Sequence, residues 1–252
     1  PHYNSPEEAT ANRYNVNGAV GQIRNKDIMG RVIINKADVY SGASMNNVTF
    51  EMQEQNGNAW HTVGTLRQSS DKYTYSLSGV VAKELDQNGN EAAYVDENGV
   101  TVSGLVWWTP RNQGNFRIVE KRVTGYSDGQ RVVWSGHLAG QMTWDPVTTE
   151  PYEVKNTPFY GYVQIAKVDS QTGNAIKSNA TFTVYEYDVA TGAYKETVGA
   201  NKITFTRNST SDKIYRSTGG YKGDGAFCYQ QSNGGKYKIV ETSTPSGYIG
   251  NY

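Results

Sequence analysis

The sequence predicts an all-β protein, on three observations: its composition, its alternation and its turn residues. The 252 residues include 19 tyrosines and 27 glycines among many Asn, Ser and Thr. This composition is typical of hairpin-rich β proteins, which are often extracellular. Apolar and polar residues alternate in short runs, and no window keeps a helical period over about three turns.

The expected strands are short and are separated by residues that favour tight turns. The strand-sized runs are 30–36, 48–52, 116–120, 162–167, 181–186 and 237–241. The turn signals are Asn56-Gly57, Asn88-Gly89, Asn98-Gly99, Thr191-Gly192 and Asn233-Gly234-Gly235. Asn and Gly tolerate the positive φ that hairpin turns require. We therefore expect short antiparallel strands.

Charge and composition exclude several classes of function. The 24 basic and 24 acidic residues cancel, so nothing favours nucleic acid or an anionic membrane surface as a partner. No apolar run approaches the roughly 18–20 residues that span a bilayer. The polar start lacks a signal region, so we expect a mature form or a piece of a longer protein. The single cysteine and the three scattered histidines predict no disulfide, no metal site and no cofactor.

The chain contains an internal repeat. Residues 30–38 align with 161–169, and 114–120 align with 235–241. Two tandem antiparallel β-sandwich domains are therefore predicted, at 29–158 and 159–252, with the boundary near Pro158. Residues 1–28 would be an N-terminal extension or the tail of a preceding domain, and an insertion near 60–98 lengthens the first domain. Only 11 residues follow Glu241, so the second domain is expected to lack its last strand.

Each apolar stripe of the predicted strands ends in a polar side chain. Because side chains alternate between faces, the stripes are Val32, Ile34 and Lys36; Phe116, Ile118 and Glu120; Tyr152, Val154 and Asn156; and, in the second repeat, Val163, Ile165 and Lys167; and Tyr237, Ile239 and Glu241. One interpretation is that the strands leave the core at their ends. The other is a buried Lys–Glu–Asn triad, favoured because Lys and Glu recur in both repeats.

Burial of this triad would have a chemical consequence. A low-dielectric interior disfavours the charged forms of lysine and glutamate. A neutral Lys36 amine is a nucleophile for the side-chain carbonyl carbon of Asn156, and a protonated Glu120 would polarise that carbonyl while ammonia leaves. The predicted product is an intramolecular isopeptide bond. It forms once per molecule, so the protein is not expected to be an enzyme with turnover.

The same residues resemble a known family, the CnaB or SpaA-type domains of Gram-positive pilins and surface adhesins. The resemblance rests on Lys36-Ala-Asp38 and Lys167-Val-Asp169, on the Gly-x-Tyr/Phe-x-Ile-Val-Glu runs, and on Glu241-Thr-Ser-Thr-Pro-Ser-Gly-Tyr248. It implies a prealbumin-like β-sandwich and an extracellular, cell-wall-anchored parent protein that acts in adhesion or pilus building. Its partners would be neighbouring domains or subunits of a surface fibre.

The resemblance also implies roles for individual residues. Lys36, Glu120 and Asn156 match the family's bonding lysine, catalytic glutamate and bonding asparagine. Lys167 and Glu241 match the lysine and the catalytic glutamate of the second domain, where no asparagine stands at the matching distance. The first domain lacks the proline of the family's signature after Glu120.

Other functions remain as alternatives. The insertion and the tryptophans of the first domain (Trp60, Trp107, Trp108, Trp134 and Trp144) could recognise a host protein or a glycan, although we expect most of these tryptophans in the core. A glycan-active enzyme needs a carboxylate pair that the spacing does not show.

Three weaker signals are set aside. A calcium-loop pattern (Asp86, Asn88, Asn90 and Glu97) has Glu91 where glycine is required. A Cys–Gln thioester from Cys228 with Gln230 or Gln231 is less favoured than a buried cysteine. Residues 14–17 faintly echo the closing strand 152–156.

Overall fold

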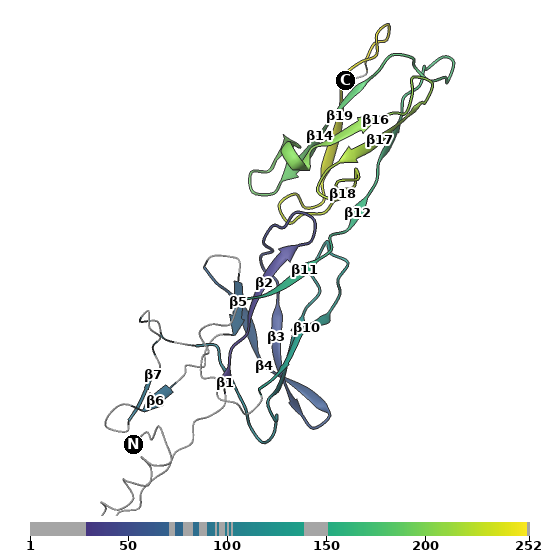
Figure 1. The fold of residues 1–252 in the computed structure, drawn as a ribbon. Coiled ribbons are helices and arrows are strands. Elements are labelled where there is room, and N and C mark those ends of the chain that lie inside the picture. The colour runs from purple at the N-terminus through teal and green to yellow at the C-terminus, as the bar shows by residue number, and fades with distance from the viewer. Residues whose placement is uncertain are drawn as a thin grey trace, which may run out of the picture. The chain divides into compact units, whose positions relative to one another are not determined.

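The fold is all-β, as the sequence predicts. The computed structural model (Figure 1) describes residues 29–70, 74–77, 83–85, 90–93, 95, 99, 101, 103–138 and 151–250. The strands up to residue 156 are β1 (Met29–Gly30), β2 (Ile33–Asp38), β3 (Phe50–Asn56), β4 (Ala59–Gln68), β5 (Thr74–Leu77), β6 (Lys83–Leu85), β7 (Glu91–Ala93), β8 (Val106–Trp107), β9 (Asn115–Glu120), β10 (Arg131–His137) and β11 (Tyr152–Asn156). The later strands are β12 (Tyr160–Gly161), β13 (Gln164–Ala166), β14 (Thr181–Asp188), β15 (Ala193–Glu196), β16 (Ile203–Thr206), β17 (Ile214–Gly219), β18 (Phe227–Cys228) and β19 (Tyr237–Ser243), with one 3₁₀ turn, η2 (Gly199–Asn201).

Two of the predicted hairpin turns connect neighbouring strands, whereas Asn88-Gly89 and Asn98 lie outside the described residues. Asn56 of β3 pairs with Ala59 of β4, and Gly57 between them has φ of 59°. Asp188 of β14 pairs with Ala193 of β15, and Gly192 in that turn has φ of 69°. Glycine adopts this left-handed backbone without the steric cost that a Cβ imposes. The Asn-Gly and Thr-Gly signals therefore set where these strands reverse.

The chain divides into two compact units. The first takes residues up to Asn35, Asn46–Lys121 and Arg131–Glu153. The second takes Lys36–Met45, Arg122–Gln130 and Val154–Tyr252. Two loops that precede Pro158 in the sequence thus belong to the same compact unit as the second repeat. The domain boundaries expected from the repeat remain a prediction.

Strand β4 organises the first large sheet, whose order is β10-β9-β3-β4-β5-β2-β11. Leu66 of β4 pairs with Phe50 of β3 on one side and with Leu77 of β5 on the other. The rings of Phe50 and Tyr75 meet edge to face, with centroids 5.1 Å apart. The apolar side chains of this sheet that are buried are Ile34, Ala37, Phe50, Met52, Leu66, Tyr75, Leu77, Phe116, Ile118, Val119 and Val154.

The second unit contains two three-stranded sheets, β13-β17-β16 and β15-β14-β19. Phe182 of β14 contacts Phe205 of β16 and Tyr215 of β17, with ring centroids 5.7 and 5.2 Å apart. Aromatic contacts of this geometry join the inner faces of the two sheets. The arrangement is a β-sandwich, as the sequence predicts.

A buried tyrosine occupies the same place in both repeats. Tyr75 lies opposite Ile34 and its hydroxyl accepts a hydrogen bond from the N–H of Val48, at 3.3 Å. Tyr215 lies opposite Ile165 and its hydroxyl accepts from the N–H of Ala180, at 3.0 Å. The tyrosines make β5 and β17 equivalent strands. From this tyrosine to the glutamate of the later strand, the first repeat runs from Tyr75 to Glu120 and the second only from Tyr215 to Glu241. The insertion expected near 60–98 remains a prediction.

The Lys-x-Asp motif has a structural explanation for its aspartate. Oδ1 of Asp38 accepts hydrogen bonds from the N–H groups two and three residues later, at 2.9 and 2.8 Å. Oδ1 of Asp169 accepts the equivalent two bonds at 3.0 and 2.8 Å. A short carboxylate side chain that bonds its own backbone in this way nucleates a turn. The aspartate thus forms a turn just beyond each lysine, at the end of β2 in the first repeat and shortly after β13 in the second.

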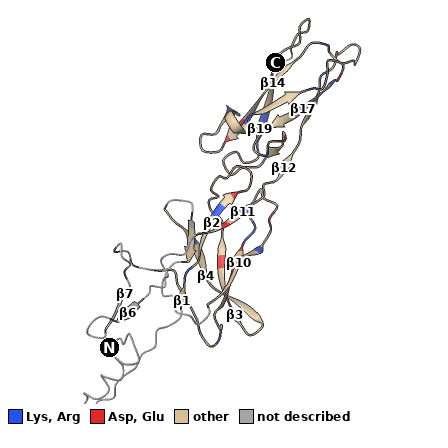
Figure 2. Cartoon of the chain, viewed as in Figure 1, with Lys and Arg blue, Asp and Glu red and all other residues tan. Residues whose placement is uncertain are grey.

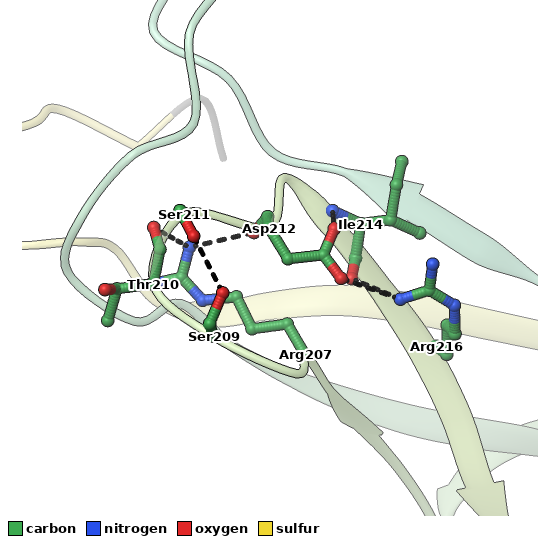
Figure 3. A network of polar contacts seen from close by, with 7 residues as sticks. All are labelled: Arg207, Ser209, Thr210, Ser211, Asp212, Ile214 and Arg216. Carbon is green, nitrogen blue, oxygen red and sulfur yellow. Dashed lines mark hydrogen bonds and ion pairs between the residues drawn. The ribbon is translucent and has the colours of Figure 1, made fainter.

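Arg207 attaches the loop after β16 to a distant segment. Its guanidinium donates to the carbonyl oxygens of Ile176, Lys177 and Ser178, at 2.6, 3.1 and 3.0 Å. It also lies over the ring of Tyr215, 5.1 Å from the centroid. Figure 3 shows the neighbouring part of this loop, where Asp212 accepts from the N–H of Ile214 and from Arg216, both at 2.9 Å. These two bonds lower the pKa of Asp212.

Replacing Arg207 by lysine should destabilise the fold. Lysine keeps the charge but cannot direct several fixed N–H groups at consecutive carbonyls. We expect Arg207→Lys to lower the free energy of unfolding by about 1–3 kcal/mol in urea titrations. The matched control is Arg216→Lys, at an exposed ion pair worth about 0–1 kcal/mol. Equal effects of the two substitutions would contradict this account.

Candidate functional site

Lys36 is a fully buried lysine on a strand of the large sheet. It lies on β2, shares a face with Val32 and Ile34, and its exposed fraction is 0 %. Figure 2 shows the charged segments of β2 within its sheet. The backbone oxygen of Lys36 accepts from the N–H of Met45, at 3.0 Å. Residues on the apolar parity of β2 are thus buried up to and including the lysine.

Asn156 ends the strand that borders β2. Strand β11 lies next to β2 in the sheet, and the N–H of Val39 donates to the backbone oxygen of Asn156, at 3.0 Å. The exposed fraction of Asn156 is 0 %, and Val154 on the same parity is also buried. Tyr152, the third member of the expected stripe, is exposed. The lysine and the asparagine are therefore buried on adjacent strands.

Glu120 ends the buried stripe of β9. Its exposed fraction is 0 %, it lies opposite Phe50 of β3, and Phe116 and Ile118 precede it on the buried face. Oε2 of Glu120 lies 3.5 Å from Nε of Arg131 on β10. The Glu120 charge also raises the pKa of Tyr75, although burial of the phenol is the larger cause. Tyr75 lies on β5, which is paired with β2. The charge of Glu120 therefore affects a side chain beside the start of β2.

These exposures decide between the two interpretations of the stripes. The interpretation that the strands leave the core at their ends does not hold for Lys36, Glu120 or Asn156, because the exposed fraction of each is 0 %. An ionisable group in such a place requires partners or loses its charge. The three residues thus have the burial that the proposed chemistry requires.

The equivalent pair of the second repeat is an ion pair. Nζ of Lys167 lies 2.8 Å from Oε2 of Glu241, with side-chain exposed fractions of 23 % and 16 %. Oε1 of Glu241 is buried and accepts no hydrogen bond from the described part of the chain. Strand β13 pairs with β17, and no described strand pairs with its other edge. The structure therefore brings Lys167 and Glu241 together in a site more open than that of Lys36.

Gln230 has a role that the sequence analysis did not find. Its Oε1 accepts from the hydroxyl of Ser41 at 2.9 Å, and its Nε2 donates to Oδ2 of Asp38 at 3.3 Å. Asp38 is the last residue of β2, and Ser41 belongs to the turn that follows it. The residues are about 190 positions apart in sequence, so no local motif signals the contact. Cys228 is buried nearby in the same strand region, as an unreactive structural cysteine would be.

The expectation that most tryptophans lie in the core is wrong for the four that are described. Trp108 has an exposed fraction of 38 %, and Trp60, Trp107 and Trp134 are half-buried. Smaller aromatic and aliphatic side chains fill the interior of the first unit instead. Tryptophan is large and has an N–H group, so it is seldom buried completely. Trp144 lies outside the described residues.

The remaining sequence signals are placed as follows. Asp86, Asn88 and Glu97 of the calcium pattern lie outside the described residues, as do residues 1–28. Within the described ranges, no three His, Cys, Asp or Glu side chains gather as metal ligands. No helix among the same residues has the length and hydropathy to cross a bilayer.

The fold is all-β and is consistent with prealbumin-like β-sandwich domains. Both repeats carry a lysine, a turn-forming aspartate and a glutamate on a later strand. Residues 161–251 match the family model of the SpaA prealbumin-like fold domain. The resemblance to SpaA-type domains expected from the sequence is thereby confirmed for the second repeat.

The chain also has similarity to several solved structures. The chain is 21 % identical to the Bacillus anthracis TIE protein, with a TM-score of 0.40, over 88 % of this chain and 30 % of that one. It is 20 % identical to a streptococcal ancillary pilin, with a TM-score of 0.25, over 90 % and 57 %. A variant of the shaft pilin SpaA from Lactobacillus rhamnosus GG is 15 % identical, with a TM-score of 0.28, over 88 % and 90 %. The chain thus spans less than two thirds of the first two proteins, and no curated protein matches it.

Removing one member of the Lys167–Glu241 pair should cost more than removing both. Glu241→Gln leaves the ammonium of Lys167 half-buried without its carboxylate, and we expect unfolding in urea to be easier by about 1–2 kcal/mol. The double variant Lys167→Met with Glu241→Leu should lie within about 1 kcal/mol of the original chain. A single variant as stable as the original would show that the pair contributes nothing.

Cys228 should resist thiol reagents in the folded protein. Burial raises the pKa of the thiol to about 11, so near pH 8 it is almost entirely protonated, whereas only the thiolate reacts. We expect negligible reaction with Ellman's reagent until the chain is unfolded in urea. Rapid reaction of the native protein would contradict the burial of this side chain.

Proposed function

We propose that the chain is a cell-surface module of pilin or stalk type, in which an autocatalytic bond between Lys36 and Asn156 rigidifies the first domain. The observation that carries this proposal is the complete burial of Lys36, Glu120 and Asn156 among apolar side chains. Stability alone gives no reason for this burial, because ionic groups inside a protein contribute little net stability. Their chemistry supplies a reason.

The proposed reaction is an amide exchange. Glu120 accepts a proton from the Lys36 ammonium, and the neutral Nζ attacks Cγ of Asn156. Glu120 then returns that proton to the side-chain nitrogen of Asn156 as the Cγ–Nδ2 bond breaks, and it takes the surplus proton from Nζ, so that the new amide nitrogen keeps one hydrogen and Glu120 ends protonated. One N–C bond forms, one breaks, and ammonia leaves. No cofactor, metal or oxidant is needed.

The bond would lie where it constrains the chain most. Lys36 is on β2 and Asn156 is at the end of β11. The link therefore closes a loop that contains all the remaining strands of the large sheet, β3, β4, β5, β9 and β10. Cross-linking the ends of a loop of this size restricts the unfolded chain by about 5 kcal/mol in the chain-entropy model. A module that transmits tension in a surface fibre benefits from this link.

The extracellular assignment is also part of the proposal. It is supported by the match of residues 161–251 to the SpaA domain model. Neighbouring domains or subunits of a surface fibre are the proposed partners, and the parent protein is proposed to be anchored to a Gram-positive cell wall. Lys167 and Glu241 occupy the positions of the bonding lysine and the catalytic glutamate in the second domain, where no asparagine stands at the matching distance, so a single bond is proposed.

Intact-protein mass spectrometry tests the bond. The folded chain should be lighter than its sequence mass by one ammonia, about 17 Da. The loss should be absent in Lys36→Ala, Asn156→Ala and Glu120→Gln. Lys167→Ala is the matched control and should keep the loss. Circular dichroism establishes that each variant is folded.

Two outcomes would change the proposal. An unmodified mass in the folded original chain would refute the cross-link. Loss of two ammonia molecules, with one abolished by Lys167→Ala, would place a second bond in the second domain.

The cross-link should also appear in stability. We expect Asn156→Ala to lower the free energy of unfolding by about 5 kcal/mol, mainly because the unfolded chain gains freedom. Denaturation in guanidinium, read by tryptophan fluorescence, follows the first domain. A loss of only about 1 kcal/mol would match a simple side-chain truncation instead.

The alternative is a ligand-binding module that uses the insertion and the aromatics of the first domain. One observation favours it: Trp108 is exposed, and Trp60 is half-buried under the guanidinium of Arg117, 4.4 Å from the ring centroid. Trp60→Ala with Trp108→Ala should then abolish adhesion to a host protein or glycan surface while the ammonia loss persists. Unchanged adhesion would favour the stalk function.

A further inference from the structure

The outer face of the sheet β15-β14-β19 carries a group of tyrosines and lysines. We call Tyr185, Tyr187, Tyr194, Lys236 and Lys238 the tyrosine–lysine face. Residues of β14 alternate between the two sides of the sheet. Val184 is buried, and Glu186 accepts hydrogen bonds from Tyr221 and Asn233. Tyr185 and Tyr187 therefore point away from the sandwich interior.

Strand register brings the members of this face together. Tyr187 is opposite Tyr194, and their rings meet edge to face at 5.3 Å. Nζ of Lys236 lies 4.8 Å from the ring centroid of Tyr187. Nζ of Lys238 lies 5.1 Å from that of Tyr185 and 5.3 Å from that of Tyr194. Cation–π contacts of this kind hold flexible lysines in defined positions.

Neighbouring carboxylates do not neutralise the two lysines of this face. Among the described residues, no carboxylate forms an ion pair with Lys236 or Lys238. Some other lysines do have such partners: Lys121 with Glu51, Lys167 with Glu241, Lys195 with Asp188 and Lys222 with Asp224. The carboxylate of this face is that of Glu196, which is exposed opposite Tyr185 and pairs with neither lysine. Two oriented ammonium groups thus remain for an external anion.

The same face of the first large sheet shows the opposite arrangement. Arg117 lies over Trp60, and its Nε donates to Gln53 at 2.8 Å. Lys121 pairs with Glu51 at 2.9 Å. The cations there are satisfied within the chain. The unpaired lysines are therefore a property of the second repeat, rather than of this sandwich surface in general.

We propose that the tyrosine–lysine face binds an acidic polysaccharide, one whose sugars carry carboxylate or sulfate groups. The two ammonium groups would take the acid groups, and the aromatic rings would contact the apolar faces of the sugars. No hydrogen bond within the described residues uses the hydroxyls of Tyr185, Tyr187 or Tyr194. These hydroxyls, with the acceptor oxygens of Glu196, match a ligand rich in hydroxyl groups.

Other anionic partners fit less well. An acidic peptide has few hydroxyls to donate to the carboxylate of Glu196 and few apolar ring faces to stack on the tyrosines. Nucleic acid requires a longer track of cations, because each phosphate adds a charge. This site is independent of the proposed isopeptide bond, since none of its residues belongs to the Lys36 site.

Titration calorimetry with defined oligosaccharides tests this site. The probes are a hyaluronan octasaccharide with carboxylates, a heparin octasaccharide with sulfates as well, and neutral chitohexaose. We expect at least one acidic probe to bind and chitohexaose not to bind. Affinity should fall as salt rises, because the exposed charges are screened. Binding by the heparin probe alone would assign the site to sulfated sugars.

Substitutions then locate the binding. Lys236→Gln with Lys238→Gln should weaken binding by about tenfold or more, and Tyr194→Ala should weaken it as well. The matched control is Lys222→Gln, because Lys222 also lies over two tyrosine rings, at 5.0 and 5.9 Å, but is paired with Asp224. It should leave affinity unchanged.

Several outcomes would overturn this proposal. They are no binding of either acidic probe, equal binding of chitohexaose, an equal loss in Lys222→Gln, or tighter binding of polyglutamate or of a single-stranded oligonucleotide. The same titration on Lys36→Ala separates this site from the proposed bond. Binding that persists there, without the ammonia loss, supports a separate site, whereas lost binding in a folded Lys36→Ala chain contradicts it.

Discussion

The burial of ionisable side chains at the ends of apolar strands is the constraint on which the rest of the large sheet depends. Lys36 and Glu120 have exposed fractions of 0 %, and such groups are costly inside a protein unless their environment compensates them. The surrounding structure meets this constraint with specific elements. Strand β11 borders β2, the turn of Asp38 ends the strand just after the lysine, and Arg131 approaches Glu120 from β10. The proposed bond between Lys36 and Asn156 would remove the ammonium charge altogether.

The second repeat shows the same residue types in a different electrostatic setting. Lys167 and Glu241 form a 2.8 Å ion pair that retains partial contact with solvent. Water stabilises both charges there, so an ion pair is sufficient and neutralisation is not required. The edge of β13 has no described partner opposite β17, whereas β2 is flanked on both sides. Equivalent side chains thus differ in burial because of the strands that surround them.

Two side-chain-to-backbone hydrogen bonds are common to both repeats, although the loops of the repeats differ in length. A tyrosine hydroxyl bonds the backbone just before the second long strand, through Tyr75 in one repeat and Tyr215 in the other. A buried asparagine accepts the N–H two residues later, at 2.8 Å for Asn112 and 2.7 Å for Asn233. Neither pair is apparent from local patterns, because the tyrosines follow loops of different length in the two repeats. For the tryptophans, the local pattern is misleading instead. Their apolar character predicts a core position, but their size and their N–H group disfavour complete burial.

The sequence by itself determined the all-β class, the hairpins at Gly57 and Gly192, the internal repeat, and which faces of β2 and β9 are apolar. These features follow from side-chain alternation and from backbone preferences, which act over a few residues. Tertiary structure decided how deeply each stripe is buried, that Gln230 bonds Asp38 and Ser41, and that Lys236 and Lys238 lie over tyrosine rings. Burial and cross-strand pairing depend on strands that are distant in sequence, so only the folded chain specifies the environment of each charge.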